Sequence, residues 1–185
     1  ITPNRGDCLG VRGIARDLSA ASIGRMKPLD TSECKGEFDS PIHWALSPDA
    51  VEIVPRVTGR YFQDVVNKSS PEWMARRLIS IGQRPISALV DITNYIMIDL
   101  GRPLHAFDAD KISGDTLFIR RANAGEKILA LNEKEYECMP DMLVISDRDG
   151  ADDIAGIMGG ERTGITDDTQ NLFLEIAIFD PISVA

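Results

Sequence analysis

An apolar stripe with a helical period runs through residues 86–100, and it constrains the fold more than any other stretch of the sequence. Apolar side chains recur there every three to four residues, as they do on the buried face of a helix. The stripe ends at Gly101, a residue type that readily takes the left-handed conformation that closes a helix. We therefore predict a helix over residues 86–100. Its stripe consists of Ile86, Leu89, Val90, Thr93, Ile96, Met97 and Leu100.

Capping signals predict two further helices. Asp7 can cap a helix that ends before Gly24, because its carboxylate can accept hydrogen bonds from free backbone amides. Ser70 can do the same for a helix over residues 70–81, and the proline that follows it is tolerated in a first turn. Gly82 is expected to end that helix.

Short β-type runs follow His105, separated by Gly, Asp and Asn. We expect them to form a mostly antiparallel sheet system. Residues 51–66 also have a strand-like pattern, whereas residues 25–50 are typical of turns. The sequence thus predicts an α+β fold in one module, residues 1–185, with a helix-rich part at about 1–105 and a β-rich part at about 106–185. The β-type runs after His105 cover residues 116–122, 127–131, 142–146, 154–158 and 172–179.

Charge and hydropathy limit the class of protein. The chain has 20 basic and 29 acidic side chains, and a net charge of −9 has the wrong sign for a domain that grips a nucleic-acid backbone unaided. There is no charge-free stretch of membrane-spanning length and no signal-peptide pattern, so a cytoplasmic protein without membrane contact is expected. The three cysteines are far apart and lack a CxxC pair, which predicts reduced, mostly buried thiols.

Most catalytic motifs are absent from the sequence. Its two histidines, His43 and His105, do not have a metal-binding spacing, so no metal is expected. Residues 156–160 are glycine-rich but lack the Lys-Ser/Thr that completes a phosphate-binding loop, and there is no GxSxG nucleophile motif. Gly159 and Gly160 indicate either a tight turn or the floor of a ligand pocket.

A few polar residues interrupt otherwise apolar segments. Thr93 and Asn94 interrupt the stripe of the best-defined helix, and Glu175 lies among apolar residues in the last β-type run. A carboxylate there either faces solvent or is buried with partners, because unpaired burial is costly. Taken alone, the residues favour a solvent-exposed Glu175 and a hydrogen-bonded structural role for His105. A functional buried acid at Glu175 is the alternative.

These segments also carry a resemblance to a known family. In the family's order, they are similar to the central third-and-fourth-domain module of bacterial phenylalanyl-tRNA synthetase beta subunits, and five matches in register are more specific than any one of them. The matching segments are residues 2–9, 89–95, 101–108, 155–160 and 174–175.

The resemblance implies a three-layer α+β module built around an unusual β-sandwich with flanking helices. It implies a parent enzyme, an α2β2 ligase that uses ATP and magnesium to attach phenylalanine to its tRNA. The aminoacylation site of that family lies in the alpha subunit, so this chain is expected to bind no cofactor and to hold tRNA(Phe) weakly on its own. The family's module continues beyond the segment that Ala185 matches, so the C-terminal end of the module is expected to be missing.

The resemblance further implies a proofreading pocket that hydrolyses mischarged tyrosyl-tRNA(Phe). Glu175 matches the acid that receives the phenolic hydroxyl, and His105 matches a histidine that helps to place the terminal adenosine or the attacking water. Thr93 and Asn94 match residues that line the pocket. Gly159, with Gly160, matches a glycine pair that leaves room for the aminoacyl group.

Two questions stay open at this point. The general base is either His105 or the terminal hydroxyl of the tRNA acting on its own ester. A non-enzymatic reading is the alternative to editing: the chain would be a structural and tRNA-docking module of the synthetase, with its polar residues dispersed and an exposed apolar patch.

Overall fold

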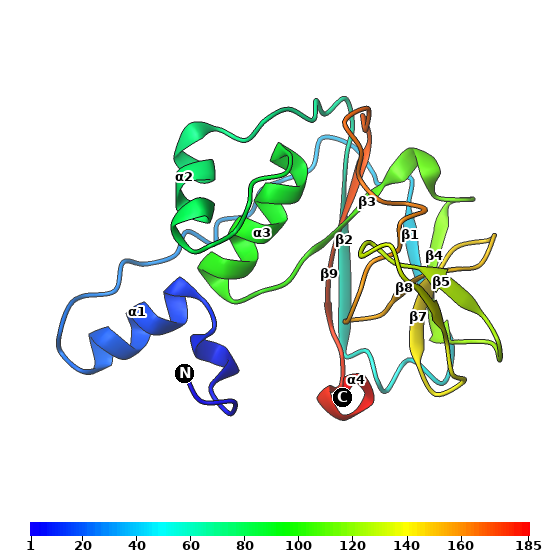
Figure 1. Ribbon diagram of the computed structural model, residues 1–185, viewed down its shortest axis with the longest axis horizontal. Helices are drawn as coiled ribbons and strands as arrows, with labels where there is room; N and C mark the ends of the chain where they lie inside the picture. Colours follow the sequence, from blue (N-terminus) through cyan, green and yellow to red (C-terminus); the bar gives the residue numbers. More distant parts are fainter. The chain divides into compact units, whose positions relative to one another are not determined.

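The computed structural model describes all residues from 1 to 185, which divide into two compact units (Figure 1). The helical unit takes residues 1–39 and 69–104, and the sheet unit takes residues 40–68 and 105–185. The residue boundaries of the helix-rich and β-rich parts therefore differ from the expected ones, because residues 40–68 supply two strands to the sheet unit. The predicted α+β class is confirmed.

Glycines allow two helices of the helical unit to approach closely. A Cβ atom on Gly10 would lie 2.5 Å from the backbone nitrogen of Gly101, so a side chain at Gly10 would push the two segments apart. Gly101 also ends its helix with a φ of 68°, as the sequence predicts. The unit contains the 3-10 helix η1 (Gly6–Cys8) and the helices α1 (Val11–Ala20), α2 (Glu72–Ser80) and α3 (Ala88–Leu100).

The start of α2 differs from the prediction. Pro71 is the N-cap residue, and the hydroxyl of Ser70 does not cap the helix but hydrogen-bonds the carboxylate of Asp91 on α3. Asp91 is fully buried and also accepts a hydrogen bond of 2.9 Å from the backbone nitrogen of Ile86. This buried carboxylate therefore ties the segment before α2 to the start of α3.

The first helix also begins later than predicted. Asp7 lies in η1, and Gly10 is the N-cap residue of α1, where it offers no side chain to the free amides. The apolar residues of α1 remain partly open to solvent: Ile14 is 44% exposed and Leu18 is 45% exposed. None of the helices combines the length and the apolar composition that crossing a membrane requires.

The sheet unit contains three sheets. Strands β1, β4, β7 and β8 form one sheet in that order, β2, β9 and β3 form a second, and β5 pairs with β6. All pairs are antiparallel except β1 with β4, so the mostly antiparallel prediction is confirmed. The strands are β1 (His43–Leu46), β2 (Arg56–Phe62), β3 (His105–Asp108), β4 (Thr116–Arg121), β5 (Lys127–Leu129), β6 (Glu135–Glu137), β7 (Leu143–Ser146), β8 (Ala151–Ile154) and β9 (Leu172–Ile178).

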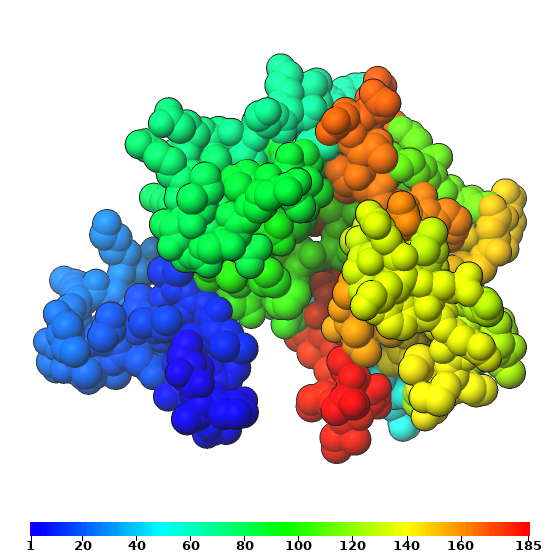
Figure 2. Space-filling view, viewed as in Figure 1, coloured from blue at the N-terminus to red at the C-terminus, as the bar shows by residue number.

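The main core lies between the two larger sheets, which makes the sheet unit a sandwich. Phe107 and Phe173 come from β3 and β9, and they share one apolar cluster with Leu117, Ile119 and other residues of the four-stranded sheet. A smaller cluster lies beneath the β5–β6 hairpin. The 3-10 helix η2 (Ala109–Lys111) follows β3, and α4 (Pro181–Val184), red in Figure 2, lies at the surface of the unit.

Strand predictions were wrong mainly where strands are short. The strands β1, β3 and β6 have three or four residues and were not predicted. The strand expected over residues 51–66 is limited to β2, and Val51 is 57% exposed. The strand expected over residues 154–158 is wrong: β8 precedes it and ends at Ile154, and the chain then turns back at Gly156, whose φ is 74°.

Candidate functional site

His105, Glu175 and Gly59 form one row across the three-stranded sheet. Glu175 lies on the central strand β9, directly opposite His105 on β3 and Gly59 on β2. Residues directly opposite each other in an antiparallel pair point to the same face. Phe173, two residues before Glu175, points to that same face and belongs to the sandwich core. His105 and Glu175 therefore face the inside of the sandwich.

Burial corrects one of the sequence expectations. Glu175 is only 6% exposed, so the favoured reading of a solvent-exposed side chain was wrong. Strand β9 is apolar on both sides of the sheet, and the alternation that separates a solvent face from a core face is missing there. Glu175, the one acid of this strand, points to the same inner face as Phe173.

The loop after β8 places Gly159 against the imidazole ring of His105. A Cβ atom on Gly159 would lie 2.3 Å from Cε1 and 2.9 Å from Nδ1 of that ring. A Cβ atom on Gly160 would lie 2.0 Å from the carbonyl oxygen of Asp152. A side chain at either glycine would collide with these neighbours, which explains why both positions lack one. The two readings open for this pair, a tight turn and a pocket floor, both stay predictions.

Asp153 is a member of this cluster that the sequence did not suggest. It lies on β8, is 3% exposed, and accepts a hydrogen bond of 2.6 Å at Oδ1 from the backbone nitrogen of Gly160. Its Oδ2 atom is 3.4 Å from Nε2 of His105. Nε2 is buried without a hydrogen bond, so the hydrogen-bonded histidine that the sequence favoured is not found at this nitrogen. The only signal in the sequence was the pair of consecutive aspartates before Ile154.

Burial disfavours the charged forms of both partners of this contact. It lowers the pKa of His105 to about 4, because the cluster disfavours the charged imidazolium. Burial also raises the pKa of Asp153 well above its ordinary range, and the nearby charges of Asp152 and Glu175 raise it further. Burial therefore favours a neutral imidazole and a protonated acid in this pair at 3.4 Å, although opposite charges would attract at that distance.

We expect His105 to make the stability of the chain pH-dependent. Between its ordinary pKa of 6.5 and about 4, the unfolded chain binds a proton at this residue and the folded chain does not, so the free energy of unfolding falls as the pH falls. The loss is at most about 3 kcal/mol, because each unit of pKa shift is worth about 1.4 kcal/mol and the side chain keeps some hydration.

Urea unfolding between pH 4 and pH 7, with His105→Gln as the matched variant, measures this effect. Asp152 and Asp153 titrate with the opposite sign, because a raised pKa of an acid favours the folded state at low pH. The difference between the two proteins isolates the histidine, because both aspartates are present in each. A difference that does not change with pH would contradict a buried neutral His105.

Thr93 and Asn94 lie on α3 in the helical unit, and both are partly buried. The hydroxyl of Thr93 donates a hydrogen bond of 2.7 Å to the carbonyl oxygen of Val90, one helical turn earlier. Such a bond satisfies the hydroxyl within its own helix. Their place in a common pocket with His105 and Glu175 stays a prediction.

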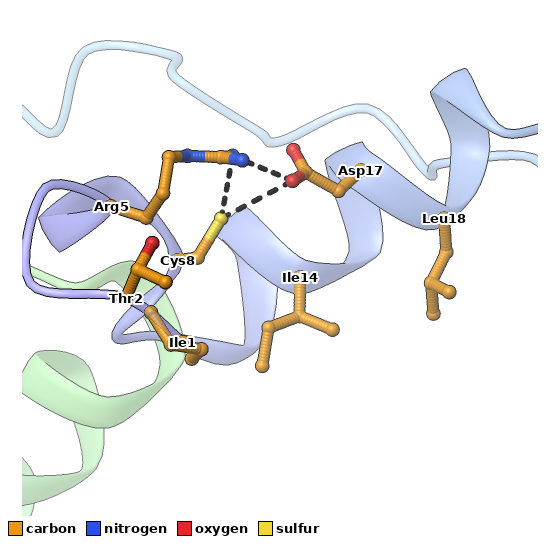
Figure 3. Close-up of a pocket in the computed structure, with 7 residues that line it drawn as sticks. All are labelled: Ile1, Thr2, Arg5, Cys8, Ile14, Asp17 and Leu18. Atoms are coloured by element: carbon orange, nitrogen blue, oxygen red, sulfur yellow. Dashed lines mark hydrogen bonds and ion pairs between the residues drawn. The ribbon is translucent and has the colours of Figure 1, made fainter.

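A second polar cluster lies beside a cavity of about 450 Å³ in the helical unit (Figure 3). Asp7, Cys8 and Asp17 offer three atoms that could bind a cation. Arg5 already bridges both carboxylates, at 2.9 Å to Asp7 and 2.6 Å to Asp17, and Arg16 pairs with Asp7 as well. Burial and the neighbouring Asp17 raise the pKa of the Cys8 thiol. A protonated thiol and carboxylates that are already paired with arginines are typical of an ion-pair network. To bind a cation, the thiol would have to lose its proton and the carboxylates would have to release the arginines.

Fold and cluster together define an α+β domain whose β-sandwich brings a histidine and two buried acidic residues together. The chain belongs to the B3/4 domain family, whose sequence profile matches residues 53–185.

Curated relatives extend this match over the whole chain. It is 53% identical over 185 residues to a phenylalanine–tRNA ligase beta subunit from Ruegeria pomeroyi and 51% identical to one from Novosphingobium aromaticivorans. Each alignment covers 100% of this chain and 23% of the relative, so the chain spans about a quarter of the length of these relatives.

A solved structure shares the fold. It is an N-terminal fragment of the phenylalanyl-tRNA synthetase beta subunit from Pyrococcus horikoshii, with a TM-score of 0.53 and 18% identity. The match covers 97% of this chain and 54% of that chain.

Proposed function

We propose that this chain is the editing module of a phenylalanyl-tRNA synthetase beta subunit and hydrolyses tyrosine wrongly attached to tRNA(Phe). The observation that carries the proposal is the burial of Glu175 on the inner sheet face, next to His105 and in a strand that is otherwise apolar. The similarity to phenylalanine–tRNA ligase beta subunits supports the same activity.

Such an enzyme needs proofreading for a physical reason. A pocket built for phenylalanine rejects an added hydroxyl by only about a hundredfold, because a hydrophobic site cannot strongly exclude it. A second pocket can select for that hydroxyl instead. The phenol of tyrosine can donate a hydrogen bond to a carboxylate, whereas the ring of phenylalanine displaces water from the carboxylate without replacing its hydrogen bonds.

The residues of the cluster suit the hydrolysis of an ester. Water adds to the ester carbonyl carbon, the bond from that carbon to the terminal ribose oxygen breaks, and the ribose oxygen takes up a proton. Gly159 has no side chain, so its backbone lies directly against the ring of His105. The neutral imidazole of His105 can orient the water or the ester, and the terminal hydroxyl of the tRNA stays an alternative proton acceptor.

The rest of the parent enzyme belongs to the same proposal. The alpha subunit would supply the aminoacylation site with ATP and magnesium, in a cytoplasmic α2β2 enzyme that holds most of the tRNA. The charges of this chain agree with that division. The sheet unit has 20 acidic and 10 basic side chains, so it cannot attract the tRNA backbone by itself.

A docking role remains the second candidate, and one observation favours it. The helical unit exposes several large apolar side chains, and such side chains are typical of surfaces that contact other protein parts. Trp73, Ile79 and Ile86 are 51%, 60% and 67% exposed.

The deciding experiment compares preformed tyrosyl-tRNA(Phe) with phenylalanyl-tRNA(Phe) as substrates of a synthetase whose beta subunit contains this chain. We expect the enzyme to hydrolyse the tyrosyl ester and spare the phenylalanyl ester. Glu175→Ala should slow hydrolysis of the tyrosyl ester by about 5- to 150-fold, the equivalent of about 1–3 kcal/mol for a lost buried hydrogen bond. The matched control is Glu52→Ala, an exposed glutamate of the same unit, which should leave the rate unchanged.

Two results would overturn the proposal. An enzyme that spares both esters would leave the docking role as the better description. Equal losses on both esters in the Glu175→Ala enzyme would show that Glu175 does not select for the phenol.

A further inference from the structure

The contact between Asp153 and His105 points to a role that the editing proposal does not assign. Oδ1 of Asp153 is held by the Gly160 backbone nitrogen at 2.6 Å, so Oδ2 is the oxygen that faces the ring. It lies 3.4 Å from Nε2, a buried nitrogen that has no other hydrogen-bond partner. A buried polar atom without a partner is rare and costly, and a small shift of either side chain would close this contact to a hydrogen bond.

The surrounding charges decide which partner carries the proton. Asp152 on β8, Glu175 on β9 and Arg162 in the following loop are the charged groups that face Asp153, in addition to His105 on β3. Arg162 is committed to Asp147 at 2.8 Å and to Asp152 at 3.4 Å. Asp153 thus has two carboxylates near it and no cation of its own, which favours the protonated acid.

We propose that Asp153 is a positioning residue: as a protonated acid it donates a hydrogen bond to Nε2 of His105 and thereby fixes the imidazole as its Nδ1–H tautomer. The partner of one ring nitrogen determines which nitrogen carries the hydrogen. The Nδ1–H group then lies on the Gly159 side of the ring.

This inference rests on the proposed function for its meaning in catalysis, because the tautomer of His105 matters to the reaction only if the ester binds at the imidazole. With the hydrogen on Nδ1, His105 offers a hydrogen-bond donor at that nitrogen to an oxygen of the substrate or of the water. It has no lone pair there with which to accept a proton. Of the two proton acceptors left open above, His105 and the terminal hydroxyl of the tRNA, only the hydroxyl then remains.

Nitrogen-15 NMR of the 185-residue chain at pH 7 tests the tautomer directly. Only two histidines are present, and the exposed His43 serves as an internal reference. We expect His105 to show a hydrogen on Nδ1 and a lone pair on Nε2. In Asp153→Asn the amide oxygen can accept from Gly160 while the amide nitrogen donates to Nε2, so the tautomer should persist. In Asp153→Ala it should change to the mixture that His43 shows.

The variants have matching expectations in the synthetase. Asp153→Asn should hydrolyse tyrosyl-tRNA(Phe) within about threefold of the parent enzyme, and Asp153→Ala should be about 100-fold slower, the usual loss when a reacting group is misplaced by about 1 Å. A purely structural role would not make the asparagine variant rescue the tautomer.

Three outcomes would overturn the inference: a hydrogen on Nε2 in the unaltered chain, an imidazolium at pH 7, or an unchanged tautomer in Asp153→Ala. If Asp153→Ala does not fold, the tautomer of the unaltered chain still decides the question. Because the NMR measurement needs no tRNA, a wrong tautomer rejects the positioning role alone. A synthetase that spares the tyrosyl ester rejects the proposed function alone.

Discussion

Replacing Phe173 with alanine is expected to lower the free energy of unfolding by about 3–5 kcal/mol, the range typical of a fully buried phenylalanine. Phe173 is 1% exposed and lies on the central strand of its sheet, opposite Phe107 and Tyr61 on the two neighbouring strands. Its ring centroid is 5.7 Å from that of Trp44, which brings the second sheet into the contact.

The cavity left by this substitution cannot easily collapse. Below the ring lies Gly59, and a Cβ atom there would be 2.1 Å from Cζ of Phe173. The glycine thus has no side chain to move into the vacant space, and the flanking strands are held by hydrogen bonds to β9. The upper part of the range is expected for this reason.

Urea unfolding of the 185-residue chain measures the loss, with Phe118→Ala as the control. Phe118 belongs to β4 in the same sandwich but is 39% exposed, so its removal should cost about 1 kcal/mol or less. Equal losses in the two variants would show that the sandwich core is not centred on Phe173.

The helices were predictable from the sequence because their signals are local. The apolar period and Gly101 indicated α3 correctly, since both act within a few residues of the helix. The capping residues were less reliable. Ser70 and Asp7 are good cap formers, yet other side chains bind both. Ser70 hydrogen-bonds the distant Asp91, and Asp7 pairs with the neighbouring Arg5.

The short strands were not predictable because pairing with distant residues creates them. Strand β3 has only four residues, and its place depends on its pairing with β9. Such pairs leave no periodic pattern in so few residues. The same reason explains why the sequence gave no hint of the contact between His105 and Asp153, which come from strands of different sheets.

The candidate site was suggested by resemblance and not by the residue pattern. From the residues alone, Glu175 was expected to face solvent, and its burial became evident only from the sheet register. The structure places His105, Glu175 and Gly159 together within the sheet unit. Buried acids that lie close together also raise each other's pKa, and this is often a property of functional sites. Asp153 next to Glu175 has that property.

Gly159→Ala is expected to slow hydrolysis of tyrosyl-tRNA(Phe) by about 100-fold in the parent synthetase. The new methyl group would lie 2.3 Å from Cε1 of His105, so the ring must move, and a displacement of about 1 Å in a reacting group can cost that much. The backbone of Gly159 does not have a positive φ, so alanine adds no conformational strain there. The effect of the substitution is therefore steric and acts through the imidazole.

Single-turnover deacylation measures the rate, and nitrogen-15 NMR of His105 in the 185-residue chain shows whether the ring has moved. Gly24→Ala is the control, because a Cβ atom at Gly24 would meet no atom within 4 Å. A Gly159→Ala enzyme with an unchanged rate, in which the His105 signals have shifted, would show that the imidazole position does not matter for the reaction. An unchanged rate with unshifted signals would show that the loop makes room for the methyl group by moving away from the ring.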